Sequence, residues 1–226
     1  MKILQRGKAV LILIQFVITV TVVIIFMKFF NKYHWFFRRK WAQMQAKLLG
    51  YKLIINGKPD INAQMLLLNH QSLLDIVIIE GIYPQNVAWV AKKEIADMFF
   101  FGQILTLPKM IIIDRESSRS LVQIIKEAKE LLKDDRVIAM FPEGTRGDGT
   151  KLLPFKQGAK IVAQKLNLLV QPAVITNTRN IVDSQNFLAK KGTVTITYLE
   201  PVNPKNDPNW FENMKTDMQK ILDKEL

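Results

Sequence analysis

The stretch MLLLNHQSLLD, residues 65–75, passes from a wholly apolar run through four polar residues into a second apolar run. A short run without polar interruptions is typical of a strand buried on both faces, and the change of pattern after it predicts that a helix begins there. Further runs of this kind continue down the chain at 87–91, 109–113, 136–141 and 168–175, and residues 193–199 alternate as a half-buried strand does.

Helical patterns separate these runs. Residues 117–133 carry one apolar face, with Ser117 as the expected N-cap. Residues 208–225 form a second helical pattern, for which Asp207 is the expected cap and Pro208 lies in the first turn. Alternating strands and helices predict an α/β fold with a largely parallel or mixed buried sheet flanked by helices.

Composition excludes several classes of protein. The 226 residues include no cysteine, which rules out disulfide frameworks, cysteine zinc sites, iron–sulfur clusters and a cysteine nucleophile. The net charge of +12 is concentrated before residue 60, where 11 Lys/Arg occur with no acid, and the rest of the chain is nearly neutral. A nucleic-acid binder carries its basic patch on the folded body, so this distribution indicates a membrane surface and no nucleic-acid partner.

Residues 9–27 form an uncharged apolar run of nineteen residues, long enough to span a bilayer as a helix. The run lacks a signal-peptide cleavage pattern, and cations on both flanks, with Arg38 among those that follow it, argue against a buried core helix. The aromatic and basic residues 29–41 also allow an interfacial hairpin. We expect a spanning or deeply embedded helix, a membrane-anchoring segment over 1–49 and an α/β domain over 50–226. The excess of cations after the run predicts a cytoplasmic domain, at the inner membrane if the source is bacterial.

His70 is the only histidine after residue 34, and it follows a predicted strand, where open α/β sheets gather their active sites. Two positions five residues apart on one helix point about 140° away from each other. His70 and Asp75 therefore meet only if His70 lies in the loop and Asp75 in the first turn of the helix. A carboxylate there would hold one imidazole tautomer and favour proton abstraction by the other nitrogen. Ser72 and Asp75 equally have the spacing of a capping box, which leaves both interpretations open.

Two further strings end predicted strands. Residues 141–146 read FPEGTR: Gly144 allows a close approach, Thr145 offers a hydroxyl and Arg146 a planar donor group suited to phosphate. Glu143 would repel an anion, so we expect it to orient an arginine or accept a hydrogen bond from a substrate hydroxyl. A charged surface turn is an equally good interpretation of this string. Arg115 follows the run 111–113, either as a site residue or as a salt-bridged strand end.

Taken together, these strings resemble the glycerolipid acyltransferase family over roughly residues 50–205. The resemblance rests on four blocks in family order: His70 with Asp75, the strand ending at Arg115, Glu143 to Arg146, and the strand around Pro172. The string FKQGA at 155–159 is also similar. Family members often have glycine shortly before the second block, where this chain has Pro108, Lys109 and Met110.

The resemblance implies a glycerol-phosphate acyltransferase-like fold and direct transfer of a fatty acyl group from an acyl thioester to the hydroxyl of lysophosphatidic acid. It makes His70 and Asp75 the catalytic pair, and it assigns phosphate binding to a set of five residues: Arg115, Glu143, Gly144, Thr145 and Arg146. No metal or cofactor is expected, and coenzyme A and acyl carrier protein both stay open as the carrier of the acyl donor. The expected partners are therefore lysophosphatidic acid, the thioester and anionic membrane lipids.

Three alternatives accompany this expectation. The acceptor could be another lysophospholipid or glycerol 3-phosphate. Ser72 could be the nucleophile of a lipid hydrolase, although no Gly-x-Ser-x-Gly elbow surrounds it. A protein that only binds anionic lipid through its basic segment would have the same charge distribution.

Overall fold

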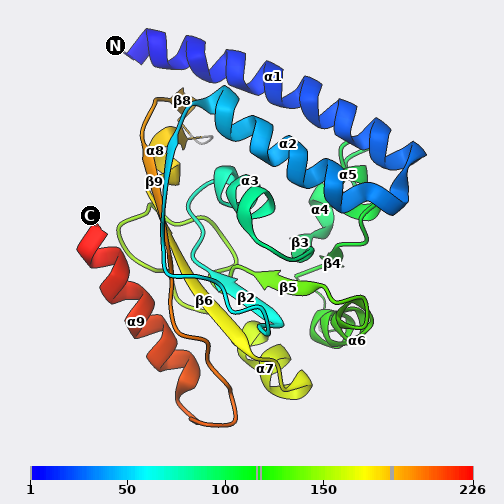
Figure 1. Ribbon diagram of the computed structural model, residues 1–226, viewed down its shortest axis with the longest axis vertical. Coiled ribbons are helices and arrows are strands. Elements are labelled where there is room, and N and C mark those ends of the chain that lie inside the picture. The colour runs from blue at the N-terminus through cyan, green and yellow to red at the C-terminus, as the bar shows by residue number, and fades with distance from the viewer. Residues whose placement is uncertain (1, 116, 118, 184–185, 226) are drawn as a thin grey trace.

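The computed structural model describes residues 2–115, 117, 119–183 and 186–225, and it has a central sheet with helices on both faces (Figure 1). Within these residues, seven strands form the sheet, and two short strands pair separately. The sheet strands are β1 (Lys52–Asn56), β2 (Met65–Leu68), β3 (Val87–Lys92), β4 (Ile111–Ile113), β5 (Val137–Met140), β6 (Val170–Thr176) and β9 (Thr193–Tyr198). The separate pair is β7 (Val182–Asp183) with β8 (Leu188–Ala189).

The strand order is β1-β9-β6-β2-β5-β3-β4. The five strands from β6 to β4 are parallel, β9 is antiparallel to β6, and β1 is parallel to β9. The predicted mixed, largely parallel sheet is thus confirmed. Because the five parallel strands run the same way, the segments that follow β2, β4, β5 and β6 emerge at one edge of the sheet.

Helices cover both faces of the sheet because its central strands are apolar on both sides. Along β2, Met65 and Leu67 pack into one core cluster and Leu66 and Leu68 into another, as the two-residue period of a strand requires. The first cluster lies under α6 (Ser120–Leu132), α7 (Gln157–Leu166) and α9 (Trp210–Glu225). The second lies under α3 (Leu73–Ile82) and α2 (His34–Leu49). The short helices are α4 (Lys93–Ala96), α5 (Gln103–Thr106) and α8 (Thr178–Ile181).

Some element boundaries differ from the prediction. Ser117 is not the N-cap of α6, which begins at Ser120, because the amide of Ser117 bonds to the carbonyl of Asp114 in a preceding turn. α9 begins at Trp210, so Asp207 and Pro208 lie in the turn before it, where the Asp207 carboxylate accepts from the amide of Asn209 at 2.8 Å and the Asp207 carbonyl accepts from the amide of Trp210 at 3.1 Å. Strand β1 was not predicted, since four of its five residues are exposed and its sequence shows no alternation.

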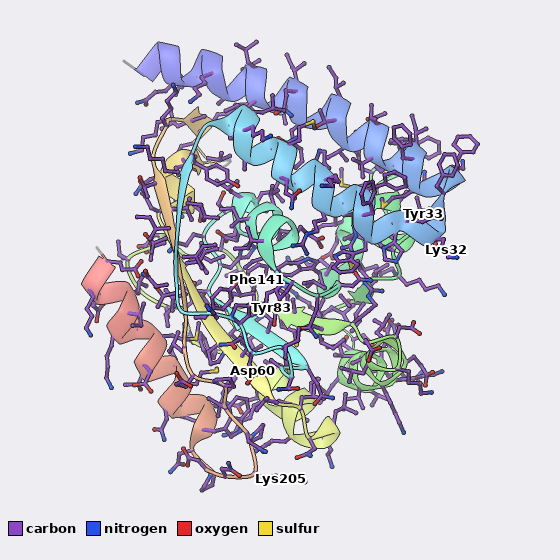
Figure 2. All side chains as sticks on the ribbon, in the orientation of Figure 1. Lys32, Tyr33, Asp60, Tyr83, Phe141 and Lys205 are labelled. Carbon is purple, nitrogen blue, oxygen red and sulfur yellow. The ribbon has the colours of Figure 1, made fainter. Side chains whose placement is uncertain are left out.

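The amino-terminal segment is a helical hairpin of α1 (Lys2–Phe29), the 3-10 turn η1 (Asn31–Tyr33) and α2. Figure 2 labels Lys32 and Tyr33 at its turn. By length and composition, residues 5–29 of α1 could cross a membrane. Two polar residues of this run face α2: Thr19 accepts hydrogen bonds from Gln45 at 2.9 Å and Trp41 at 3.0 Å, and Gln15 donates to Gln45 at 3.1 Å. These contacts hold α1 lengthwise along α2.

α2 is in turn fastened to the α/β domain by a buried cation. Arg38 is 3% exposed and bonds to Glu80 of α3 at 2.5 Å and to Asn86 at 2.7 Å. Burial lowers the pKa of Arg38, and the carboxylate of Glu80 opposes that shift. The sequence pattern placed Arg38 among membrane-flanking cations, and this expectation was wrong because the side chain finds an anion inside the protein.

Candidate active site

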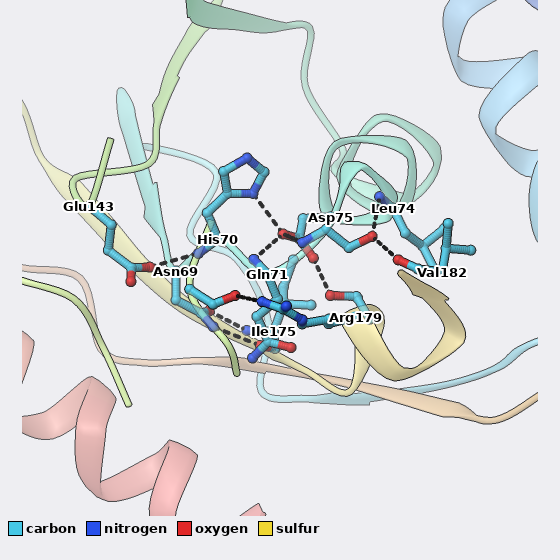
Figure 3. A network of polar contacts seen from close by, with 12 residues as sticks. Asn69, His70, Gln71, Leu74, Asp75, Glu143, Ile175, Arg179 and Val182 are labelled. Carbon is cyan, nitrogen blue, oxygen red and sulfur yellow. Dashed lines mark hydrogen bonds and ion pairs between the residues drawn. The ribbon is translucent and has the colours of Figure 1, made fainter. Parts of the chain in front are cut away.

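His70 and Asp75 are in contact at the end of β2. His70 lies in the loop 69–72 and Asp75 in the first turn of α3, and His70 Nδ1 is 2.8 Å from Asp75 Oδ2 (Figure 3). The same carboxylate oxygen accepts from the amides of Gln71 at 2.7 Å and Ser72 at 2.8 Å, while the Ser72 hydroxyl accepts from the amide of Leu74. The capping box and the His–Asp pair therefore coexist, because one oxygen serves both.

Thr178, at the start of α8 beyond β6, holds the other oxygen of Asp75. Its hydroxyl donates to Oδ1 at 2.5 Å, and both residues are 0% exposed. The two positions are 103 residues apart in sequence. The sequence analysis missed Thr178, since the only signal was that it shortly follows a predicted strand.

The imidazole of His70 is held by a ring stack as well as by Asp75. Phe141 lies parallel to it, with ring centroids 3.8 Å apart and an interplanar angle of 11°, and Trp89 also stacks on Phe141, with ring centroids 5.2 Å apart. The His70 side chain is 12% exposed. Its Nε2 has no hydrogen-bond partner among the described residues, and Figure 3 shows one ring nitrogen joined to Asp75 and the other open. This nitrogen is therefore available to a ligand.

Glu143 clamps the segment after β5 onto the His70 loop. It is 3% exposed, and its two oxygens accept from the amides of His70 and Leu153, each at 2.8 Å. Gly147 adds a second link by donating to the carbonyl of His70 at 2.8 Å. Burial raises the pKa of Glu143, and the two backbone hydrogen bonds oppose that shift. Both carboxylate oxygens of Glu143 accept from the backbone, so the expectation that Glu143 orients an arginine or meets a substrate hydroxyl finds no support among its contacts with the described residues.

The structure brings Arg115 to this segment although the two are distant in sequence. Arg115 Nη1 donates to the carbonyl of Gly144. Gly144 has a φ of +71°, a conformation that side chains disfavour, and its amide closes a turn onto Phe141 at 2.9 Å. Thr145 is exposed and Arg146 is half-buried in the same turn. The guanidinium of Arg115 and the turn 144–146 thus lie at the edge that carries His70.

Lys109 adopts a glycine-like backbone conformation before β4, where family members often have glycine. Its φ is +52°, so a lysine occupies the left-handed region that glycine adopts without strain. Arg136, which is 4% exposed, donates to the carbonyls of Pro108 at 2.8 Å and Lys109 at 3.1 Å. These bonds hold the strained turn in place ahead of Arg115.

Ser72 is positioned as a structural residue. It is 2% exposed, and its hydroxyl donates to the carbonyl of Val182 at 2.8 Å. No hydrogen bond joins it to His70 among the residues that the structure describes, and the imidazole uses Nδ1 for Asp75. This arrangement disfavours the serine-nucleophile alternative, which needs a serine that is both exposed and paired with its base.

The site can therefore take a proton from a ligand beside a cationic turn. Nδ1 of His70 is held by a carboxylate, which would stabilise the imidazolium formed when Nε2 accepts a proton. Arg115 and Arg146 offer charge and donors for an anionic group on the same ligand.

Comparisons with known proteins identify chains with a similar sequence and fold. Residues 55–176 match the family model described as Acyltransferase. The chain is 44% identical over 175 residues to a 1-acyl-sn-glycerol-3-phosphate acyltransferase of Helicobacter pylori (strain J99), with 76% of this chain and 74% of that protein aligned. It is 32% identical to the protein of the same name from Cocos nucifera, with 71% of this chain and 53% of that protein aligned.

One solved structure has the same fold. The crystal structure of a 1-acyl-sn-glycerophosphate acyltransferase from Thermotoga maritima superposes with a TM-score of 0.79 at 23% identity. The alignment covers 97% of each chain. The hairpin of α1 and α2 is thus part of an architecture shared over almost the whole length.

Proposed function

The chain belongs to the acyltransferase family, and on that premise we propose that it transfers a fatty acyl group from an acyl thioester to the hydroxyl of 1-acyl-glycerol-3-phosphate, forming phosphatidic acid. The single observation that carries this proposal is the His70–Asp75 contact of 2.8 Å beside the turn 144–146. It supports the proposal of a general base beside cations at one edge of the sheet.

In the proposed reaction, Nε2 of His70 takes the proton of the acceptor hydroxyl. The oxygen attacks the thioester carbonyl, a C–O bond forms, the C–S bond breaks, and the departing thiolate takes the proton from the imidazolium. Asp75 stabilises the imidazolium between these two proton transfers. Because the acceptor oxygen attacks the thioester directly, no acyl-enzyme is needed. The stack of His70 on Phe141 keeps the ring orientation constant while its charge changes.

The phosphate of the acceptor would be held by Arg115 and Arg146, with the backbone of Gly144 and Thr145 alongside. Fixing the phosphate fixes the hydroxyl near His70, and such positioning supplies much of the rate in a reaction between two bound substrates. Glu143 supports this site indirectly, since its carboxylate joins the His70 loop to the segment that carries the turn.

We also propose that the α1–α2 hairpin holds the enzyme on an anionic membrane, with α1 embedded along one leaflet and the α/β domain on the cytoplasmic side. Exposed apolar side chains along α1 support this, among them Leu11, Ile14, Ile18 and Phe29. The bonds of Thr19 and Gln15 to α2 favour the embedded form over an independent spanning helix.

The test uses purified protein with acyl-coenzyme A or acyl carrier protein and a panel of lyso-acceptors, following thiol release and the ester product together. We expect His70→Ala to reduce ester formation by roughly 10²–10⁴-fold with vesicle binding unchanged, and Ser72→Ala to keep acyl transfer. Ester formation at the parental rate by His70→Ala contradicts the proposal. Equal use of acceptors without a phosphate removes the role of the two arginines.

A further inference from the structure

The turn between α4 and α5 presents bulky apolar side chains to solvent. Phe99 is 101% exposed, Met98 50% and Ile95 43%. They lie within five consecutive residues of a segment that otherwise carries Ala96 and Asp97. A fully exposed phenylalanine that follows two exposed apolar side chains within five residues indicates a surface that contacts another apolar phase.

Backbone hydrogen bonds close the turn, so this exposure is part of the fold. The amide of Asp97 bonds to the carbonyl of Lys93 at 2.9 Å, and the amide of Gly102 bonds to that of Met98 at 2.8 Å. A Cβ at Gly102 would lie 1.9 Å from the carbonyl oxygen of Ala96, so only glycine allows the turn to close. Phe99 is therefore held outward by the backbone.

The same turn is continuous with the apolar hairpin. Phe100 and Phe101 pack against the cluster of Val20, Val23, Ile24 and Met27 on α1. The Asn31 side chain donates to the carbonyl of Leu107 at 2.8 Å, which joins the end of α5 to η1. The exposed aromatic residues at that end of the hairpin are Phe29 at 75%, Phe30 at 53% and Tyr33 at 56%.

The turn also adjoins the active-site edge. β3 runs directly into α4, at the edge where β2, β4 and β5 end. Glu94 of α4 interacts electrostatically with Arg115. Lys92 and Lys93 at the start of α4 provide positive charge suited to anionic headgroups.

We propose that Ile95, Met98 and Phe99 insert into the phospholipid bilayer as a second membrane contact, separate from the hairpin and next to the catalytic edge. This inference rests on the proposed function, since it needs a lipid surface as the partner. Two contacts, one from the hairpin and one from this turn, orient the edge of His70 and Arg115 toward the membrane. An acceptor lipid then reaches the site without leaving the bilayer completely.

The chain contains no cysteine, so single cysteines allow site-specific labelling. Phe99→Cys carries an environment-sensitive fluorophore, Phe29→Cys reports on the hairpin, and Ile61→Cys is the matched control. Ile61 is 63% exposed and precedes β2, at the opposite edge of the sheet. The vesicles contain phosphatidylcholine and phosphatidylglycerol. We expect a blue shift and quenching by lipids with nitroxide-labelled acyl chains at positions 99 and 29, and neither at 61. An aqueous signal at 99 while 29 is quenched overturns the inference.

A second variant gives a functional readout. Phe99→Ser should weaken partition into the same vesicles on the order of tenfold, because one phenylalanine leaves the apolar phase. Ester formation on vesicle-borne acceptor should fall by a similar factor, with activity on a water-soluble short-chain acceptor retained. Parental partition by Phe99→Ser contradicts the inference and leaves the proposed function standing. A parent protein inactive on both acceptors contradicts the proposed function, while the labelling result at position 99 still decides the membrane contact.

Discussion

Thr178→Val removes one hydroxyl from the deepest part of the site and keeps the shape of the side chain. The bond from Thr178 to Asp75 Oδ1 is 2.5 Å, and neither residue is exposed to water. A hydrogen bond to a charged group contributes about 1.5–3 kcal/mol, and no water replaces this one, so we expect a loss of about 2 kcal/mol in the free energy of unfolding. Urea unfolding measures this loss.

The effect on catalysis should be smaller than removal of the base. Oδ2 of Asp75 keeps its three donors in Thr178→Val: His70 Nδ1 and the amides of Gln71 and Ser72. The pair survives but its carboxylate loses one restraint, so we expect kcat for ester formation to fall about tenfold, equivalent to about 1.4 kcal/mol. Thiol release with saturating acceptor measures kcat.

Thr178→Ser is the matched control, because it restores the hydroxyl without the methyl group. We expect it to recover most of kcat. A Thr178→Val protein with parental kcat would show that Thr178 only stabilises the fold. A Thr178→Ser protein as slow as Thr178→Val would show that the methyl packing, and not the hydrogen bond, positions Asp75.

Three further outcomes test other parts of the structure. Glu80→Gln leaves the buried Arg38 guanidinium without its anion, so urea unfolding should show a loss of roughly 3–5 kcal/mol, and a loss below about 1 kcal/mol would mean that the ion pair does not fasten α2. Burial, followed by the positive charges of Arg38, Arg136 and Lys109, lowers the pKa of His34 to about 4 from 6.5. The unfolded chain therefore binds a proton between pH 6.5 and 4 that the folded chain does not, so the free energy of unfolding falls as the pH is lowered through this window. After allowance for solvent screening, His34→Gln should reduce the difference in the free energy of unfolding between pH 7 and pH 4.5 by about 1 kcal/mol. An unchanged difference would contradict this. Lys109→Gly relieves a left-handed residue and should raise the urea midpoint by an amount equivalent to about 0.5–1 kcal/mol, whereas a lower midpoint would show that the turn is not strained.

The sequence predicted the parts of the site that depend on short separations. His70 and Asp75 are five residues apart across a strand end and a helix start, so local backbone geometry allowed their contact. It left a capping box as an equal interpretation, and the family resemblance favoured the pair. The position of Arg115 and the segment 143–146 at the same edge also followed, because apolar runs identified the strands before them. Parallel strands bring their carboxyl ends together whatever the loop lengths.

Other residues have roles that depend on the fold as a whole. Glu143 was expected to orient an arginine or to accept a hydrogen bond from a substrate hydroxyl, but it is buried and accepts from two amides, which joins the His70 loop to the segment after β5. Arg38 was expected among headgroup cations, and Glu80, 42 residues away, holds it inside the protein. The residue type determines whether a side chain is positively or negatively charged, but its partner depends on which elements pack together.

By itself the sequence determined the alternation of strands and helices, the apolar segment at the amino terminus and the five-residue spacing that allows His70 to meet Asp75, because each of these depends on residues that are near neighbours along the chain. Only the tertiary structure decided that α1 lies along α2, that Thr178 supports Asp75 from 103 positions away, and that Phe99 stands outward beside the hairpin. These arrangements arise from the order of strands in the sheet and from burial of polar groups against distant partners. No spacing within the chain encodes them.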